Sequence, residues 1–340
     1  MYTKDGYIIG VKSMTEELLN KIVCPFCKTK LYKIDSIQNG LNIKILFCFN
    51  CISKFLVVNN SINFNINYKD KYSLEKNLKK ILLYEKDSII KLLNANNKEL
   101  NISDIYIKLE YYKMLKDYKN IQKIYEEFDF DIYSIESKQV LYKAFDKLSE
   151  CLLDKSDKYI LDFAAGNCIM SEYLNSKSIF LNYIINDISI NNLLVAQNRN
   201  RLKKSNISYL AFDICNGPFK EKSIDYAISF VGFQNIANTT KVIYNLSKIV
   251  RNSIYHISTF CDETDKVNLM ALRMSNMNIA WVKSNFIQLL KNFNIKYKEI
   301  YSEKATIHPL PYGKIIKGFR SDRFPIKETV LEYNLGELIL

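Results

Sequence analysis

The sequence lacks any long apolar run. None of its hydrophobic stretches approaches the roughly 18 residues that a membrane-spanning helix needs. The opening segment, Met1–Met14, carries early charges and no apolar core, so a secretory signal peptide is not expected. These absences predict a cytoplasmic protein without a membrane span. The eight cysteines are therefore not expected to form disulfides, because cytosolic thiols are kept reduced.

Arginine and histidine are also scarce. Only six of the 48 basic residues are arginines, and the only histidines are His256 and His308. The formal net charge of +12 favours an acidic partner, such as nucleic acid or an anionic surface. The abundance of Lys, Ile and Asn leaves a second explanation open, namely an AT-rich genome. The hydrophobic content of 48% is ordinary for a globular protein, and 340 residues suffice for two or more modules.

Four cysteines stand in two pairs with the spacing C-x2-C-x20-C-x2-C: Cys24, Cys27, Cys48 and Cys51. Two pairs of thiolates on turns, brought together by a hairpin, are typical of tetrahedral zinc. Because all four positions are filled by the protein, the predicted zinc is structural rather than catalytic, and it supplies folding energy to a short module. The alternative is four buried free thiols.

The stretch Tyr159–Leu174 has the layout of a nucleotide-binding turn. An apolar strand is followed by small residues and then by apolar residues at helical spacing. In such a layout the backbone approaches the ligand closely and the helix N-terminus faces it. Only Gly166 remains of the usual three glycines, because Ala164 and Cys168 occupy the first and third positions. Cys168 is the larger departure.

Further strands follow, and two of them end in an acid, namely Asp187 and Asp213. Helical or loop segments separate the strands, which predicts an α/β fold with a Rossmann-like, doubly wound, mostly parallel sheet. The predicted strands are 159–163, 183–187, 207–213, 224–230, 253–260, 295–302 and 314–319, and the predicted helices include 140–153, 239–250 and 284–293.

This series resembles the class I S-adenosylmethionine-dependent methyltransferases. The matching residues lie in the first turn (Asp162, Ala164, Gly166), after the second strand (Asp187-Ile188-Ser189), in the Asp213–Phe219 segment and in the 224–229 strand. The resemblance covers roughly the C-terminal half, and the series is far more specific than any single motif. The cysteine module, in turn, is similar over Cys24–Leu31 and Cys48–Val57 to small zinc-ribbon proteins that bind and activate methyltransferases.

The resemblance implies a role for each matching residue. Asp187 would bind the ribose hydroxyls, and Asp213 with the amide of Ile214 would bind the adenine amino edge. Helix or loop capping is the alternative for both acids. Backbone around Gly166 would pass under the methionine part, with Asp162 at the amino group or fixing the turn. The full predicted cofactor set is Asp162, Phe163, Ala164, Gly166, Asp187, Ile188, Asp213, Ile214 and Phe230.

A catalytic base is not identified by the sequence. The fourth strand is not followed by N-P-P-Y, which disfavours amino-group methylation of the adenine or glutamine type. His256, His308 and Tyr312 are candidates, although a lone histidine on a strand is more often a core residue. Catalysis by proximity alone is also open, because the sulfonium donor is already activated.

These patterns predict a zinc ribbon over 1–66, a helical linker or acceptor lid over 67–150 and a methyltransferase domain over 151–340. The tyrosines of the helical region would stack on bases, line an acceptor pocket or simply pack in the helix core. The predicted function is methyl transfer from S-adenosylmethionine to a small-molecule or natural-product acceptor. The alternatives are an RNA methyltransferase that binds RNA through the ribbon and the basic surface, and a non-catalytic binding module. The sequence does not predict the oligomeric state.

Overall fold

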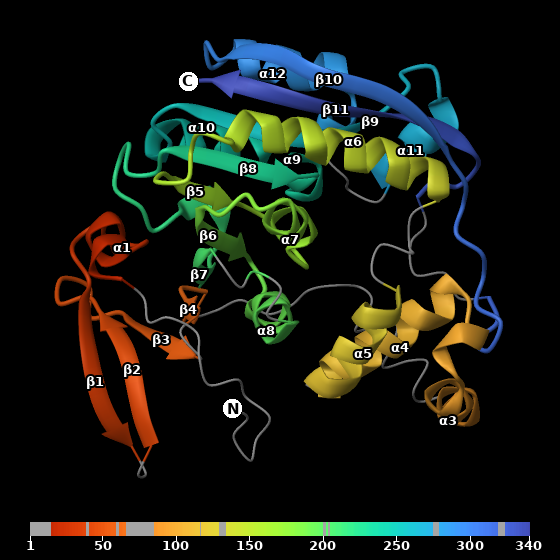
Figure 1. Ribbon diagram of the computed structural model, residues 1–340, viewed down its shortest axis with the longest axis horizontal. Coiled ribbons are helices and arrows are strands. Elements are labelled where there is room, and N and C mark those ends of the chain that lie inside the picture. The colour runs from red at the N-terminus through yellow and green to blue at the C-terminus, as the bar shows by residue number, and fades with distance from the viewer. Residues whose placement is uncertain are drawn as a thin grey trace.

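One sheet runs through the protein, and the cysteine module forms one end of it (Figure 1). The computed structural model describes residues 15–38, 41–58, 61–65, 85–115, 117–128, 134–199, 202, 205–274, 279–318 and 324–340. The strand order is β1-β2-β3-β4-β7-β6-β5-β8-β9-β11-β10. The strands are β1 Tyr32–Gln38, β2 Leu41–Phe47, β3 Lys54–Val58, β4 Ser61–Asn63, β5 Tyr159–Asp162, β6 Asn182–Asp187, β7 Asn206–Ala211, β8 Tyr226–Phe230, β9 Ser253–Cys261, β10 Lys296–Ile307 and β11 Thr329–Ile339.

The middle of the sheet is parallel and both ends are antiparallel. Strands β4, β7, β6, β5, β8 and β9 pair in parallel, so their carboxyl ends meet at a single edge. The chain adds β6 and β7 on one side of β5, then β8 and β9 on the other. In open α/β sheets a ligand crevice forms outside the carboxyl ends, where the strand order reverses. The α/β fold expected from the sequence is confirmed. The carboxyl edge is the usual position of a ligand-binding site in such a sheet.

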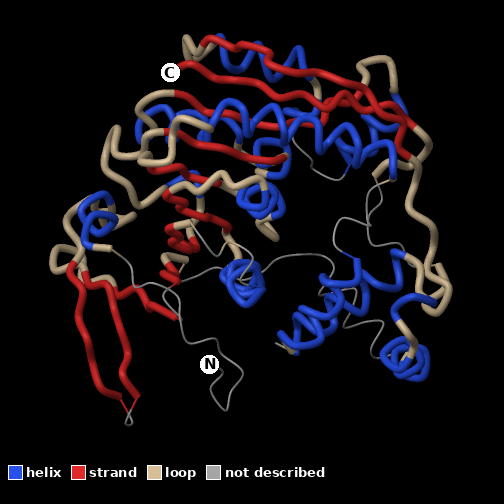
Figure 2. Tube along the Cα trace, viewed as in Figure 1, coloured by secondary structure: helices blue, strands red, loops and turns tan. Residues whose placement is uncertain are grey.

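Helices cover the parallel strands on both faces, as Figure 2 shows. The helices of the described ranges are α1 Glu16–Lys21, α3 Lys86–Asn94, α4 Ile102–Leu115, α5 Tyr118–Phe128, α6 Ile135–Leu152, α7 Ile169–Ser176, α8 Ile190–Arg199, α9 Gly232–Asn235, α10 Thr239–Ile249, α11 Lys266–Met274 and α12 Lys283–Lys291, with short 3-10 turns η1 Asn97–Glu99, η2 Ile214–Asn216 and η3 Ile279–Trp281. Of these, α3, α4 and α5 stand apart from the sheet. None of the helices in the described ranges is both long and apolar enough to cross a membrane.

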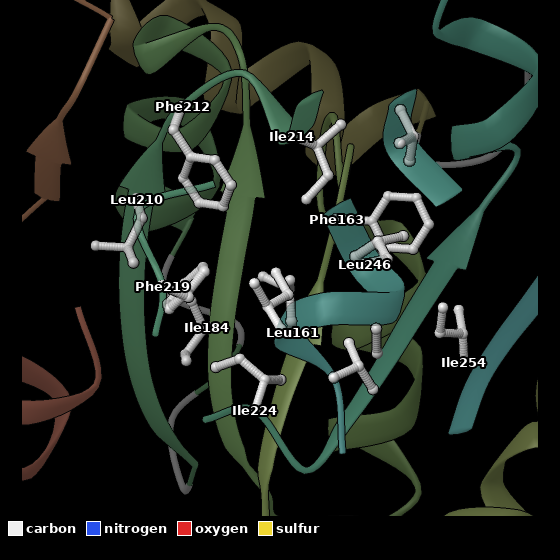
Figure 3. Packing of buried hydrophobic residues seen from close by; sticks show 14 of the residues in the cluster. Leu161, Phe163, Ile184, Leu210, Phe212, Ile214, Phe219, Ile224, Leu246 and Ile254 are labelled. Carbon is white, nitrogen blue, oxygen red and sulfur yellow. The ribbon is translucent and has the colours of Figure 1, made fainter. Parts of the chain in front are cut away.

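Successive strand residues fall alternately into two hydrophobic clusters. Leu161 and Ile184 belong to the cluster on one face, while their neighbours Ile160 and Ile185 belong to the cluster on the other. This follows from the two-residue period of a strand, whose side chains point to opposite faces. Figure 3 shows the first cluster, in which Leu161 and Ile184 lie with residues such as Leu246 of α10. Burial on both faces explains why these strands read as continuous apolar runs.

The cysteine module is joined to the parallel sheet by β4, a feature that the sequence did not indicate. Ile62 and Asn63 pair with Leu210 and Ala211 of β7. Backbone bonds fix α1 to the loop after η2, because Val23 N–H donates to the Pro218 carbonyl at 2.8 Å. Buried residues of the module also share one hydrophobic cluster with the parallel strands. The module is therefore part of the same packed core.

The helices α3 to α5 hold together through their own apolar cluster and contact the rest at two places. At one contact the Arg199 guanidinium of α8 lies 4.7 Å from the centroid of the Tyr125 ring. At the other, the buried Asp104 carboxylate accepts the N–H groups of Lys314 at 2.7 Å and Ile315 at 3.2 Å. The Arg199 contact lies beside α7, and the Asp104 contact lies in the loop after β10. These helices therefore link two separated parts of the carboxyl edge (Figure 1).

One strand expected from the sequence is absent from the described residues. The last strand is not 314–319 but β11, because the bonds from Asp104 hold 314–316 against α4 as bends. Helix α6, which packs against β10 and β11, spans residue 150, the position proposed as the boundary between the helical region and the methyltransferase domain. Residues 66–84, which include the start of the predicted helical region, lie outside the described residues. The helix expected near 239–250 is present as α10, and Asn238 caps its start because its Oδ1 accepts from Lys241 N–H at 3.0 Å.

Candidate cofactor and metal sites

Two turns of the same design carry the four cysteines. In the first, Cys24 N–H donates to the Thr29 carbonyl at 2.8 Å. In the second, Cys48 N–H donates to the Ser53 carbonyl at 2.9 Å. The residue after the second cysteine of each turn has a left-handed backbone, with φ of 59° at both Lys28 and Ile52. Matching turns of this kind direct the four sulfurs toward a common centre.

The four sulfur atoms lie within 4.8 Å of one another. The Cys24–Cys51 and Cys27–Cys48 sulfur distances are 3.5 Å and 3.3 Å, close to the roughly 3.8 Å separation implied by tetrahedral Zn–S bonds of about 2.3 Å. The Thr29 hydroxyl lies 3.0 Å from the Cys27 sulfur and lowers the pKa of that thiol to about 5. Neighbouring hydroxyls of this kind orient and stabilise thiolate ligands. The residues therefore fit a four-thiolate metal ion.

The small-residue turn keeps a glycine-like backbone without its glycines. Ala164, Gly166 and Cys168 have φ values of 51°, 52° and 59°. A left-handed non-glycine residue costs on the order of 1–2 kcal/mol, so the surrounding structure must impose this conformation. Cys168, whose side chain is fully buried, directly precedes α7 and also packs in the core. Alternating left-handed residues are typical of turns that present backbone N–H groups to a ligand.

The end of β6 holds this turn in place. Gly166 N–H donates to Asp187 Oδ2 at 3.0 Å, and Ala165 N–H donates to the Asn186 carbonyl at 2.8 Å. Asp187 Oδ1 meanwhile accepts from Ser189 N–H at 2.8 Å. Asp187 therefore joins the first turn to the start of α8, as a cap does. Asn192 Nδ2 also donates to Oδ1, at 3.2 Å, so both carboxylate oxygens take part in holding this edge together.

Asp162 lies beneath the turn and is almost completely buried. Burial raises the pKa of its carboxyl group to about 7, with a further increase from Asp187 that the Ser171 hydroxyl partly offsets. Ser171 of α7 donates to its Oδ2. This contact joins the end of β5 to the first turn of α7. The structure thus places Asp162 where it fixes the turn.

The third predicted acid, Asp213, follows β7 by two residues at the carboxyl edge. Asp213 Oδ1 accepts from Cys215 N–H at 2.9 Å and so caps η2. The Ile214 side chain packs in the core, and its carbonyl accepts from Asn245 Nδ2 at 2.8 Å. Because β6 and β7 are adjacent and parallel, Asp187 and Asp213 follow neighbouring strand ends. The sequence-predicted acids are therefore brought to one edge.

The end of β8 carries a second strained turn. Val231 has a φ of 54°, which is uncommon for a β-branched residue. Gly232 follows, and a Cβ there would stand 2.1 Å from the Ser229 hydroxyl and 3.3 Å from the Ala164 Cβ. Only glycine allows α9 to start this close to the first turn. Phe230 packs edge-on against Phe145 of α6, with ring centroids 5.6 Å apart. Phe163 is fully buried, so it would meet a ligand through its backbone alone.

The candidate bases occupy very different surroundings. His256 is 1% exposed and lies among Phe233, Phe286 and Tyr297, and burial lowers its pKa to about 3. This is the environment of a neutral core histidine, away from solvent. His308 follows β10 and is exposed, with Nδ1 3.0 Å from a Glu328 carboxylate oxygen. Tyr312, also exposed, lies in the loop that packs on α4.

Three residues of this edge were missed by sequence reasoning. Asn186 ties β6 to β7, because its Nδ2 donates to the Phe212 carbonyl at 2.9 Å. Arg199 pairs with Glu172 at 2.8 Å and also donates to the Asn167 carbonyl of the first turn. Asn65 reaches the edge from the cysteine module. Asn186 directly precedes the predicted acid and could have been noticed, but the other two are brought there only by tertiary structure.

The parallel part of the sheet matches a known protein family. Residues 161–256 match a protein family described as a methyltransferase domain. No curated protein sequence matches the chain. Among solved structures it is similar to YcgJ from Bacillus subtilis (11% identity, TM-score 0.46, 58% of this chain and 98% of that one), to a SAM-dependent methyltransferase from Aquifex aeolicus (14%, 0.38, 56% and 88%) and to phosphoethanolamine N-methyltransferase 2 from Haemonchus contortus (16%, 0.41, 56% and 52%). The predicted enzyme class, a SAM-dependent methyltransferase, is confirmed.

Proposed function

We propose that this methyltransferase binds S-adenosylmethionine across the carboxyl ends of β5, β6 and β7. The bond from Gly166 N–H to Asp187 Oδ2 carries the proposal, because it brings the two most diagnostic motifs into contact. The donor's methionine part would lie over the turn at Gly166. Its ribose hydroxyls would donate to Asp187, and its adenine amino group would meet Asp213. The sheet order and its reversal beside β5 support a doubly wound, Rossmann-like arrangement around this crevice.

The chain's own contribution to methyl transfer is orientation and exclusion of water. The donor supplies an activated methyl group, which a nucleophile of the acceptor takes while S-adenosylhomocysteine leaves. The strained turns at Ala164 and Val231 would fix the backbone on both sides of the point where the methyl group passes from donor to acceptor. Fixed geometry of this kind replaces the entropy of bringing reactants together. No basic side chain from the described residues is required for this step.

The four cysteines would hold a structural zinc ion. All four ligand positions are filled by sulfur, so no position is left for a substrate or a water. Loading the metal would deprotonate the thiols, including Cys24, whose pKa burial raises to about 12. The zinc would stabilise the ribbon strands that extend the sheet as far as β7.

For the acceptor we favour a small molecule that carries both a hydrogen-bond donor and an acceptor. Gln234 of α9 is 2% exposed, and neither polar atom of its side chain has a partner among the described residues. The indole N–H of Trp281, in the adjacent η3, is also buried without one. Buried polar groups are normally paired, because leaving them unpaired costs about 1–3 kcal/mol each. Gln234 lies in α9, which starts at the turn of Val231, and η3 contacts α9.

RNA is the second candidate acceptor, and an exposed face of the ribbon favours it. Tyr32 and Phe49 are 43% and 64% exposed and their ring centroids lie 5.0 Å apart. The Lys30 ammonium lies 5.3 Å from the Tyr32 ring, and Lys54 is in register with Phe47 on the same sheet. Exposed aromatic rings among lysines are typical of single-strand binding surfaces.

Calorimetry and isotope transfer test these proposals. We expect micromolar binding of S-adenosylhomocysteine by the zinc-loaded full chain; an absence of binding would contradict the cofactor site. A labelled methyl group should then pass from the donor to the low-molecular-weight fraction of a cell extract. Label in the RNA fraction, together with RNA binding that weakens steeply with salt, would instead support the second candidate.

A further inference from the structure

The ribbon delivers one side chain to the proposed cofactor edge. Strand β4 pairs with the last two residues of β7, and Phe64 N–H donates to the Ala211 carbonyl at 2.8 Å. This pairing carries the chain past the end of β7. Asn65, the next residue, therefore lies beside the loops that follow β6 and β7. Its backbone is fixed by Asn63, whose Oδ1 accepts from Asn65 N–H at 3.0 Å.

The Asn65 amide bridges those two loops. Its Nδ2 donates to the Ile188 carbonyl at 2.8 Å, and its Oδ1 accepts from Asp213 N–H at 3.1 Å. One loop carries Ile188, which follows Asp187, the residue proposed to bind the ribose. The other loop carries Asp213, the residue proposed to bind the adenine. Asn186 already joins β6 to β7 within the strands, so Asn65 adds a second link further out, where the ligand would lie.

An amide is the side chain that suits this position. It offers a donor and an acceptor on one planar group, and the two loops require one of each. A carboxylate could accept from Asp213 N–H but could not donate to the Ile188 carbonyl. A short apolar side chain could do neither. The match of Asn65 to both partners is therefore specific, and it joins a residue of the cysteine module to residues about 120 and 150 positions later.

We infer that Asn65 is a positioning residue for the adenosine half of the cofactor, and that it sets the preference for adenine. The inference rests on the proposed binding mode. Asn65 holds the Asp213 backbone at a fixed separation from the Ile188 loop, and so it aims the Asp213 carboxylate at the purine amino group. Because the two loops are already held in place before binding, less conformational entropy is lost when the ligand binds. The ribbon is thereby a structural part of the nucleotide pocket.

The test compares two asparagines that bridge the same pair of strands. Asn65→Ala removes the link at the carboxyl end. Asn206→Ala removes the link at the amino end, where Asn206 Nδ2 donates to Asn182 Oδ1 at 2.8 Å. Binding of S-adenosylhomocysteine and of S-inosylhomocysteine, which lacks the purine amino group, is measured by calorimetry on the zinc-loaded full chain. Zinc content and Tm are measured for each variant.

We expect Asn65→Ala to weaken S-adenosylhomocysteine binding about ten-fold, as expected from the loss of two hydrogen bonds of modest net strength. Binding of S-inosylhomocysteine should weaken much less, so the preference for adenine falls. Asn206→Ala should change neither affinity. A merely structural role for Asn65 would weaken both ligands equally, and that result would overturn the inference.

Other outcomes are equally decisive. Failure of the wild-type protein to bind S-adenosylhomocysteine would contradict the proposed function itself. Wild-type binding with an unchanged Asn65→Ala affinity would contradict only the role of Asn65. If Asn65→Ala fails to fold, Asn65→Asp takes its place, since it keeps the shape and the Asp213 contact but loses the donor. An unaltered adenine preference in Asn65→Asp would then refute the inference.

Discussion

Replacing Asp187 tests the proposed cofactor site most directly, and the structure shows which replacement to use. Asp187→Ala would leave three donors without their acceptor: Gly166 N–H, Ser189 N–H and Asn192 Nδ2. Each hydrogen bond to a charged group contributes about 1.5–3 kcal/mol. The alanine variant should therefore lose at least about 4.5 kcal/mol of stability, and its loss of binding would be ambiguous. Asp187→Asn is the better change, because its amide oxygen still caps α8.

Asp187→Asn should reduce S-adenosylhomocysteine affinity by about 100-fold. The amide replaces one acceptor oxygen by a donor, which would face both Gly166 N–H and the ribose hydroxyls. Loss of the hydrogen bonds from the two ribose hydroxyls, at about 1.4 kcal/mol each, corresponds to that factor. The Tm should fall by only a few degrees. Isothermal calorimetry on the zinc-loaded chain measures the first quantity and thermal unfolding the second.

Asp225→Asn provides the matched control. Asp225 lies at the opposite edge of the sheet, is also nearly buried, and accepts from Tyr159 N–H at 2.9 Å across the β5–β8 pair. Its replacement should lower the Tm comparably and leave cofactor affinity unchanged. If both variants kept full affinity, or if both lost it equally, Asp187 would act through stability alone and the ribose assignment would be refuted.

The remaining predictions concern stability, pH and metal. The folded-state pKa of Asp162 is raised from 3.8 to about 7, so its neutral form favours folding and the free energy of unfolding should fall as pH rises from about 4 to 7. Asp162→Asn should flatten this dependence in unfolding measured from pH 4 to 8. An unchanged slope would contradict this role of Asp162. Arg199→Ala removes the cationic partner of buried Glu172 and should cost about 3–5 kcal/mol in chemical unfolding. Adding Glu172→Gln should recover most of this loss, and an additive double variant would disprove the coupling. Cys48→Ser should abolish stoichiometric zinc in metal analysis and weaken S-adenosylhomocysteine binding through Asn65; full zinc content would exclude the four-sulfur site.

The sequence alone was sufficient for the parts whose signals are local. The spacing of Cys24, Cys27, Cys48 and Cys51 predicts the cluster that the structure forms, because two short turns place each pair of sulfurs together. Strand ends at Asp187 and Asp213 were recognisable, since buried parallel strands read as apolar runs closed by a polar residue. The turn at Gly166 was recognisable despite its lost glycines, and Ala164 and Cys168 keep the left-handed backbone.

The sequence was misleading where a distant partner decides the local conformation. The apolar residues near Ile316 resemble a strand, yet the Asp104 carboxylate, over 200 positions earlier, binds their N–H groups and holds them as bends. For His256 the sequence left both a base and a core residue open, and only the structure shows the aromatic rings that surround it and the burial that lowers its pKa to about 3. Neither fact follows from spacing along the chain, because each depends on which side chain packs opposite.

What the sequence determined, then, is the set of elements, their hydrophobic faces and the chemistry of each turn, all of which depend on neighbours within a few residues. What only the tertiary structure decided is how the modules join. The pairing of β4 with β7 brings Asn65 to the loops at Ile188 and Asp213. The contact between Arg199 and the Tyr125 ring links α8 to the helical region. Pairing between strands distant in sequence is set by backbone hydrogen bonds and shared burial, and these leave no local signal for a reader of the sequence.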